Sequence, residues 1–175
     1  DSVTSMGSCT FEDCTNLETV TNLPTGILEG MGDRVFNGTK WIKSLEGDGV
    51  YLFGGWAIAY LGENTPETLT MPSDTYGICY GFLRAHGGSY AEWKLETLVL
   101  NEGLKRINGS AFEYCSGLTE INIPSTVSYI DGDAFDGCYD LTSVNIPSSV
   151  KIIGQYAFEN CMNLSSEISL DKVSF

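Results

Sequence analysis

The chain has 175 residues, 42% of them hydrophobic and 11% aromatic, a composition that can bury a globular core and is unlike that of a disordered chain. It carries 9 Lys and Arg residues against 23 Asp and Glu residues, which gives a net charge of −14, and it contains no run of basic residues. This balance argues against nucleic acid or an anionic lipid surface as a partner. No stretch approaches the ~18 consecutive apolar residues of a membrane-spanning helix, so we expect no membrane insertion by this segment.

The first predicted elements are degenerate copies of a motif that becomes regular later in the chain. The apolar spacing of that motif is carried by Phe11, Cys14, Leu17 and Val20. Val35 and Phe36 mark the beginning of the next copy. We therefore place the first repeats at about residues 9–36, and we expect them to be irregular because the terminal repeats of solenoids usually are.

A β-hairpin is predicted next. The sequence "DGVYLFGGWAIAYLGENTP" reads as one strand over residues 50–53 and a second over residues 56–61, joined by Gly54 and Gly55. Two glycines tolerate the positive φ of a tight turn. We expect this hairpin to be an insertion at about residues 37–66 that interrupts a repeat array. An apolar pair at Ile78 and Phe82 then indicates a further coil, followed by a lengthened loop at residues 84–93.

The second half of the chain repeats with a period of 23 residues. The phrase "AFEYCSGLTEINIPSTVSYIDG" begins at Ala111, its near copy begins at Ala134, and "AFENCMNL" begins at Ala157. The same register extends back to Leu95, although Asn101 stands where the other copies have Pro. Alternating apolar residues before each Pro predict a short strand, and so short a unit is stable only when neighbouring coils stack on it. We expect a single strand-rich α/β domain of about six coils over residues 1–175, with repeats at about 9–36 and 67–175.

The repeat A-F-x-x-C-x-x-L-x-x-I-x-I-P resembles the BspA-type (Treponema pallidum-type) leucine-rich repeats of bacterial surface proteins. The similarity is strong over residues 95–164, and "NGTKW" from Asn37, followed by Tyr51, Tyr60, Gly62 and Pro66, is similar to an interruption found in that family. The resemblance implies a right-handed leucine-rich-repeat solenoid with a strand on its concave side and short helical turns around each Ala-Phe-x-x-Cys. It also implies no catalytic centre, export to the cell surface and, for some members, adhesion to host or neighbouring-cell proteins.

Four of the six cysteines occupy one position of the repeat: Cys14, Cys115, Cys138 and Cys161. This regularity favours small buried thiols over a disulfide framework, because buried Cys packs as a small hydrophobic residue. A stacking distance of roughly 5 Å between coils does not by itself exclude a bridge. Cys9 and Cys79 lie outside the register, and their redox state stays open.

Candidate catalytic and metal-binding residues are few. His86 is the single histidine and follows Cys79 closely, so a Cys-His nucleophile pair can be drawn, but without a third orienting group. No zinc-ligand spacing occurs. Asp131, Asp133 and Asp136 form the most calcium-like stretch, yet they fall on repeat positions where Asp also suits a turn or a helix cap. We therefore predict no enzyme, no cofactor and no metal beyond this weak calcium candidate.

Two sets of residues are candidates for binding. Outward positions of the predicted strands form rows across the coils, with Thr97, Glu120 and Ser143 in one row and Val99, Asn122 and Asn145 in the next. Solenoids generally bind on this face, although an ordinary solvated sheet would look the same. The second set is the aromatic residues of the middle of the chain: Trp41, Tyr51, Trp56, Tyr60, Tyr90 and Trp93. Interfaces favour Trp and Tyr, but packing of the hairpin onto the coils would also use them.

Two functions follow from these observations. One is a secreted or cell-surface module, its signal peptide not present in this chain, that acts as a monomer and binds protein or glycan on host or neighbouring cells. The other is a structural spacer or stalk within a larger bacterial envelope protein, without its own ligand. Exposed Trp56 and Tyr60 would favour the binding module, whereas burial of both rings against the solenoid would favour the spacer. An enzyme would need a cavity shared by Cys79 and His86.

Overall fold

Each regular repeat of the second half of the chain folds into one coil that contains two short strands. The computed structural model describes residues 3–21, 31–32, 34–62, 66–84 and 94–165. The first strand of a coil lies just before the Pro position, as in β5 (Thr97–Val99), β7 (Glu120–Asn122) and β9 (Ser143–Asn145). The second strand follows it in β6 (Arg106–Ile107), β8 (Tyr129–Ile130) and β10 (Ile152–Ile153). The alternation of apolar residues in the sequence predicted the first strand of each regular coil, β5, β7 and β9.

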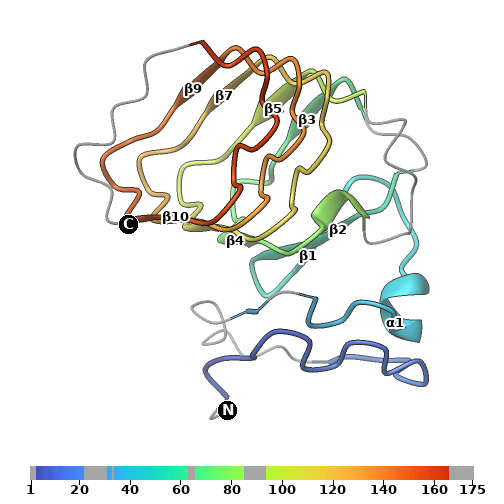
Figure 1. Cartoon of the computed structure of the whole chain (residues 1–175). Coiled ribbons are helices and arrows are strands. Elements are labelled where there is room, and N and C mark those ends of the chain that lie inside the picture. The colour runs from blue at the N-terminus through green and yellow to red at the C-terminus, as the bar shows by residue number, and fades with distance from the viewer. Residues whose placement is uncertain (1–2, 22–30, 33, 63–65, 85–93, 166–175) are drawn as a thin grey trace.

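Parallel pairing of equivalent residues stacks the coils into two sheets. Ile121 pairs with Val144, and Ile107 pairs with Ile130, so the register of the strands repeats the 23-residue period of the sequence. One sheet has the order β3-β5-β7-β9 and includes β3 (Thr68–Thr70). The other has the order β1-β2-β4-β6-β8-β10 and includes β4 (Gly77–Ile78). Figure 1 shows the two sheets along different sides of the same coils, which confirms the predicted strand-rich solenoid.

Columns of equivalent, apolar side chains fill the interior between the sheets. The rings of Phe112 and Phe135 stack with their centroids 5.4 Å apart, and Phe158 continues the column 5.3 Å beyond Phe135. The aliphatic positions of the repeat include these fully buried residues: Leu95, Leu104, Ile107, Leu118, Val127, Ile130, Leu141 and Val150. Apolar burial stabilises a fold by about 25 cal/mol per Å², so this contact between successive coils is the main source of stability.

The segments around Ala-Phe-x-x-Cys are single turns rather than helices. The amide of Cys115 donates to the carbonyl of Phe112, and the amide of Cys138 donates to that of Phe135, each closing one turn. Tyr114 follows in the same turn with a φ of 61°, in the left-handed region, which ends any helical run. The short helical turns expected from the resemblance are therefore reduced to isolated turns. Helical residues in the described chain form α1 (Lys40–Lys43) and the 3₁₀ turn η2 (Phe82–Arg84).

The predicted hairpin is present and joins the six-stranded sheet. β1 (Val50–Phe53) and β2 (Trp56–Tyr60) are antiparallel, and the turn between them uses Gly54 at φ 60° and Gly55 at φ 82°. These angles match a type I′ turn, which suits the twist of a hairpin. β2 also pairs in parallel with β4, so the second strand of the hairpin takes the place of a coil strand in the sheet.

The coil before β5 is longer than the others, as the predicted loop extension requires. Leu69 pairs with Leu98, 29 positions later, whereas regular coils repeat every 23. The loop at residues 85–93 itself lies outside the described residues. Asn101, in the Pro position, donates from Nδ2 to the carbonyl oxygens of Ser73 and Thr75 at 3.2 and 2.8 Å. An amide that binds the preceding coil thus replaces the proline of the regular unit.

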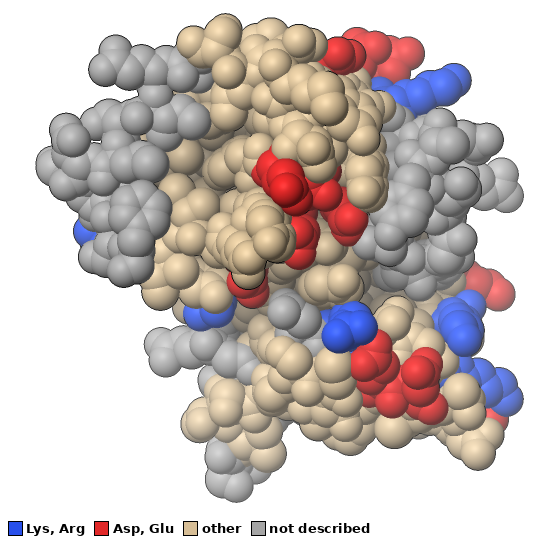
Figure 2. Space-filling model, in the orientation of Figure 1, with Lys and Arg blue, Asp and Glu red and all other residues tan. Residues whose placement is uncertain are grey.

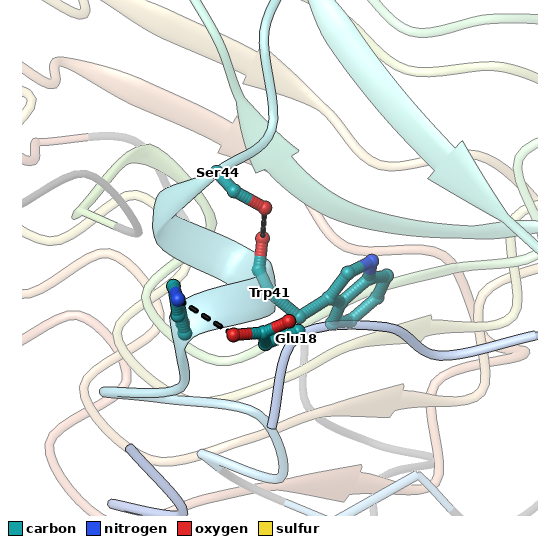
Figure 3. A network of polar contacts seen from close by, with 4 residues as sticks. Glu18, Trp41 and Ser44 are labelled. Atoms are coloured by element: carbon teal, nitrogen blue, oxygen red, sulfur yellow. Dashed lines mark hydrogen bonds and ion pairs between the residues drawn. The ribbon is translucent and has the colours of Figure 1, made fainter. Parts of the chain in front are cut away.

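Two irregular coils at the N-terminus stack on each other and on the hairpin. Met6 forms a parallel bridge with Met31, and the amide of Phe11 donates to the carbonyl of Val35 at 2.9 Å. Lys40 of α1 pairs with Glu18 at 2.6 Å, and the Ser44 hydroxyl donates to the Trp41 carbonyl at 2.8 Å (Figure 3). A second core forms here from Met31, Val35, Phe36, Trp41, Ile42, Trp56, Ile58, Ala59 and Cys79. β2 therefore lies between two cores.

Candidate functional site

A groove runs across β5, β7 and β9 on the outer face of the four-stranded sheet. Its volume is about 560 Å³. All six outward residues of the two predicted rows line it: Thr97, Val99, Glu120, Asn122, Ser143 and Asn145. The pairing of Thr97 with Glu120 and of Asn122 with Asn145 shows that each row crosses the strands side by side. The structure thus brings these candidate residues together on one surface.

The alternation of the strands separates this surface from the core. In β5 and β7 the central residue is buried while the residues on either side are exposed. Successive side chains of a strand point to opposite faces of the sheet, so stacking fixes Leu98 and Ile121 and leaves their neighbours free. The outward residues contribute nothing to the columns of the core, and their chemistry is therefore available for binding.

One hydrogen bond organises the second row. Nδ2 of Asn145 donates to Oδ1 of Asn122 at 3.0 Å. An amide side chain has two donor hydrogens and an acceptor oxygen, so Nδ2 of Asn122 and Oδ1 of Asn145 remain on the two sides of this bond. Val99 continues the row with 44% of its surface exposed. The groove therefore combines an asparagine pair with one small apolar contact.

β3 extends both rows by a fourth strand that sequence reasoning missed. Thr68 pairs with Thr97, and Thr70 pairs with Val99, with both threonines exposed. The longer coil displaces β3 from the 23-residue register, so the period could not locate it. The remaining signal was the short alternation Thr68-Leu69-Thr70 before Pro72, which the regular strands share.

The family of the chain agrees with this architecture. The model of the BspA-type leucine-rich repeat region matches residues 1–53 and 87–174 in 6 copies. The chain belongs to this family. No curated protein sequence matches it. Because the family match covers most of the 175 residues, the repeat identified in the second half also accounts for the degenerate N-terminal coils.

Two solved structures have the same fold as this BspA-type chain. A leucine-rich repeat protein from Bacteroides ovatus is 23% identical with a TM-score of 0.53, the match covering 90% of this chain and 44% of that one. A leucine-rich cell surface protein from Faecalibacterium prausnitzii is 21% identical with a TM-score of 0.53, covering 94% and 50%. The chain thus spans about half the length of these relatives. Among its own described residues, no helix is long and apolar enough to cross a membrane.

Trp56 and Tyr60 of the hairpin are buried, which corrects the expectation that these two rings offer an exposed binding surface. Trp56 is fully buried and Tyr60 is 7% exposed. Burial, together with the charge of Asp48, raises the pKa of the Tyr60 hydroxyl. Tyr51 is half-buried, with its ring centroid 6.4 Å from that of Trp41, which is itself buried. Tyr90 and Trp93 lie outside the described residues. The hairpin rings pack the junction between the two cores.

The residues singled out for catalysis or metal binding do not assemble a site in the described chain. Cys79 is buried, and His86 lies outside the described residues. Asp131 accepts from the Gly132 amide at 2.8 Å within its own turn, and Asp136 accepts from Asn160 Nδ2 of the next coil at 2.9 Å, so both carboxylates have structural partners. Among the described residues no three His, Cys, Asp or Glu side chains are placed to share a metal ion.

The burial of the cysteines differs between the inner and the outer coils of the stack. None of the six, all of which are described, forms a disulfide. Cys115 and Cys138 are buried as predicted, and burial raises the pKa of both thiols. Burial also raises the pKa of half-buried Cys161 to about 11. Cys14 is exposed, contrary to prediction, because it lies in the first described coil.

A smaller cavity of about 250 Å³ lies between the N-terminal coils and the coil of β4. Arg34 and Asn37 line it from one side, and Cys79 and Tyr80 from the other. The Arg34 guanidinium lies 5.6 Å from the centroid of the Tyr80 ring, within the range of a cation–π contact. Sequence reasoning missed this cavity because it joins distant segments. Its described lining contains no His, Asp or Glu to activate Cys79.

Proposed function

We propose that this chain is a non-catalytic, secreted or cell-surface interaction module of a BspA-type protein, and that it binds a protein or glycan on host or neighbouring cells as a monomer. The observation that carries the proposal is the groove across β5, β7 and β9, lined by outward side chains that the stacking of the coils does not require. The cell-surface relative from Faecalibacterium prausnitzii supports the location.

The groove has the physical properties of a recognition surface. β5 and β7 are paired with a parallel strand on both sides, β9 is paired with β7, and a packed core lies below all three, so the side chains of the groove are preorganised. A rigid surface loses little conformational entropy on binding, and more of the contact energy therefore appears as affinity. Polar side chains such as Asn122, Asn145 and Thr97 offer donors and acceptors that fix the orientation of a ligand.

A spacer within a larger envelope protein is the second candidate. The burial of Trp56 and Tyr60 favours it, because the aromatic residues that would have been the strongest anchors stabilise the junction of the two cores instead. In that case the groove would be an ordinary solvated sheet face.

Arrays of extracellular-matrix proteins and glycans test the proposal. The wild-type chain is compared with an Asn122→Ala, Asn145→Ala variant, which removes the asparagine pair of the groove. A matched control, Ser128→Ala, Gln155→Ala, changes two exposed polar residues that are not part of the groove. Circular dichroism verifies that all three proteins are folded. We expect binding by the wild type and the control, and loss of binding by the groove variant.

Two results on the arrays would contradict the proposal. If the folded wild type binds nothing on the arrays, or if the groove variant binds as well as the control, the groove is not the recognition site. The spacer would then be the better account of this segment.

A further inference from the structure

We infer that the groove takes an extended segment of a protein that presents Lys or Arg. This inference rests on the proposed function and names the chemistry of the partner. It follows from the position of the charge in the groove, from the apolar contact beside it, and from the hydrogen-bonding groups that continue the surface.

Glu120 gives the groove its charge. It is the one charged residue of the described lining, it is exposed, and it lies between Thr97 and Ser143 in the first row. Exposed Glu67 and Glu96 are adjacent at the start of β3 and β5, where the Glu96 amide donates to the Glu67 carbonyl at 2.8 Å. Exposed Lys94 lies two positions before Glu96 in the sequence.

The charge of the whole molecule has the same sign as the groove. The chain carries −14, and Figure 2 shows acidic side chains gathered near the middle of the visible face. An anionic surface attracts cationic partners from a distance and repels anionic ones, so this charge selects the partner before contact. The acidic polysaccharides and nucleic acids are disfavoured by the same argument.

Val99 and Glu120 match the two parts of a basic side chain. Val99 belongs to the second row and Glu120 to the first. Glu120 pairs with Thr97 of the neighbouring strand, and Val99 lies two residues after Thr97 on the same face of the sheet, so Val99 and Glu120 are diagonal neighbours. In a parallel sheet, with strands roughly 4.8 Å apart and a rise of roughly 3.3 Å per residue, such diagonal neighbours are roughly 8 Å apart. Lys and Arg have an apolar stem of similar length that ends in the charge. A bound Lys or Arg can therefore cover exposed Val99 with its stem and reach Glu120 with its charged group.

The asparagine pair fits a peptide backbone. Nδ2 of Asn122 and Oδ1 of Asn145 provide a donor and an acceptor beside their mutual bond, the combination that an amide N–H and C=O require. Strands are roughly 4.8 Å apart, so the path from β3 to β9 accommodates about four residues of extended chain. The described lining of the groove contains no Trp, Tyr or Phe on which a sugar ring could stack, which favours a protein segment over a glycan.

Binding of short peptides tests the inference. The probes are a fluorescent eight-residue peptide that alternates Lys with Ser and a matched peptide that alternates Glu with Ser. Fluorescence anisotropy is measured at about 20 mM and about 300 mM NaCl, since screening weakens exposed charge pairs. We expect the Lys peptide to bind at low salt, to bind more weakly at high salt, and the Glu peptide not to bind.

Variants separate the groove from the general charge of the molecule. Glu120→Gln should weaken binding of the Lys peptide about five- to tenfold, and Val99→Ser about threefold, because each removes one half of the contact. Glu159→Gln removes the same charge at an exposed position outside the groove and should change the affinity less than about twofold. Equal weakening by Glu120→Gln and Glu159→Gln would overturn the inference, because only net charge would then matter.

The two proposals fail in different ways. If the Lys peptide does not bind, but the arrays show binding that the Asn122→Ala, Asn145→Ala variant loses, the groove is a recognition site and the class of partner is wrong. A glycan bound in this manner would be the clearest such outcome. If neither the peptide nor the arrays show binding that depends on the groove, both proposals fail together.

Discussion

At the level of single residues, five coils contain two left-handed positions four residues apart among their described residues. They are occupied by Ser110 and Tyr114, by Asp133 and Gly137, by Tyr156 and Asn160, and in the N-terminal coils by Cys9 and Asp13 and by Arg34 and Gly38. Gly, Asn and Asp adopt this conformation readily, whereas Tyr, Arg and Ser do so at a cost. The backbone therefore repeats more faithfully than the residues do, and stacking holds several side chains in a conformation that they do not prefer.

Asp133 shows how such a position is affected by charge. Burial, followed by the carboxylates of Asp136 and Asp131, raises the pKa of Asp133. A carboxyl with a raised pKa destabilises the folded state at high pH, and this penalty decreases as the pH falls through the raised value and disappears below the ordinary value of about 3.9. Asp133→Asn should therefore increase the free energy of unfolding at pH 7 by about 0.3 kcal/mol, since solvent screens the repulsion.

Urea unfolding at pH 7 and near pH 4 measures this effect. The gain in the free energy of unfolding from Asp133→Asn should be smaller at the lower pH. Asn, like Asp, readily adopts the positive φ of 56° at this position, so the substitution adds no backbone strain. Asp74→Asn, which neutralises an exposed turn residue, is the control for net charge. A variant that is less stable than wild type at pH 7 would show that the carboxylate of Asp133 contributes a favourable contact.

The reactivity of each cysteine thiol should follow its burial. Only the thiolate reacts rapidly, and burial in an apolar environment both blocks access and raises the thiol pKa. Cys14 should therefore react with a thiol reagent in the native protein, whereas Cys115 and Cys138 should react only after unfolding. Mass spectrometry of the labelled peptides, with and without denaturant, identifies the modified positions. Native labelling of Cys115 would indicate that the regular coils open locally.

At the scale of elements, the hairpin strand β2 is the least ordinary part of the solenoid. All five of its residues are buried, because Ala57 contributes to the main core while Trp56 and Ile58 contribute to the second. Trp56 lies directly against Gly77, where an added Cβ would be 2.5 Å from the indole ring. The glycine is required by this close approach, and it allows the parallel pairing of β2 with β4.

Substitution of Trp56 should show that this strand stabilises the junction. Trp56→Ala removes a fully buried ring and should lower the free energy of unfolding by about 3–5 kcal/mol. Trp56→Phe should cost only about 1–2 kcal/mol, because the indole Nε1 has no hydrogen-bond partner among the described residues. Denaturant unfolding provides both values. Tyr139→Ala, at a 38% exposed position, is the control and should change stability by less than about 0.5 kcal/mol. An equally small effect of Trp56→Ala would mean that the two cores are independent.

The sequence predicted these elements to different degrees for physical reasons. The regular coils were predictable because stacking forces the same apolar residues to recur, and the hairpin because Gly54 and Gly55 favour its turn. The two-sided burial of β2 was missed, although "WAIAY" is a continuous apolar run, which is typical of strands covered on both faces. The rows of the groove were predicted by alternation alone. The position of Thr68 and Thr70 in these rows was not predicted, because the longer coil shifts β3 out of the 23-residue register.

Over the entire chain, acidic residues outnumber basic ones, so most acidic side chains have no basic residue to balance their charge. The ion pairs Arg34–Glu12 and Lys40–Glu18 both join the two N-terminal coils, and they are partly or fully exposed. Exposed pairs contribute little to stability, and a large net charge opposes the compact state through self-repulsion. The apolar columns of the core therefore stabilise the fold, and repulsion among the excess acidic residues destabilises it.

Salt should stabilise this protein. Raising NaCl from about 20 mM to about 500 mM shortens the range of the repulsion and should increase stability by about 1 kcal/mol, or about 2–4 °C in Tm. Thermal unfolding followed by circular dichroism measures the shift. The same titration near pH 4.2, the isoelectric point of the sequence, is the control, because the net charge and hence the stabilisation by salt should be small there. A salt effect of equal size at both pH values would indicate that exclusion of salt from the protein surface, rather than screening of the net charge, stabilises the solenoid.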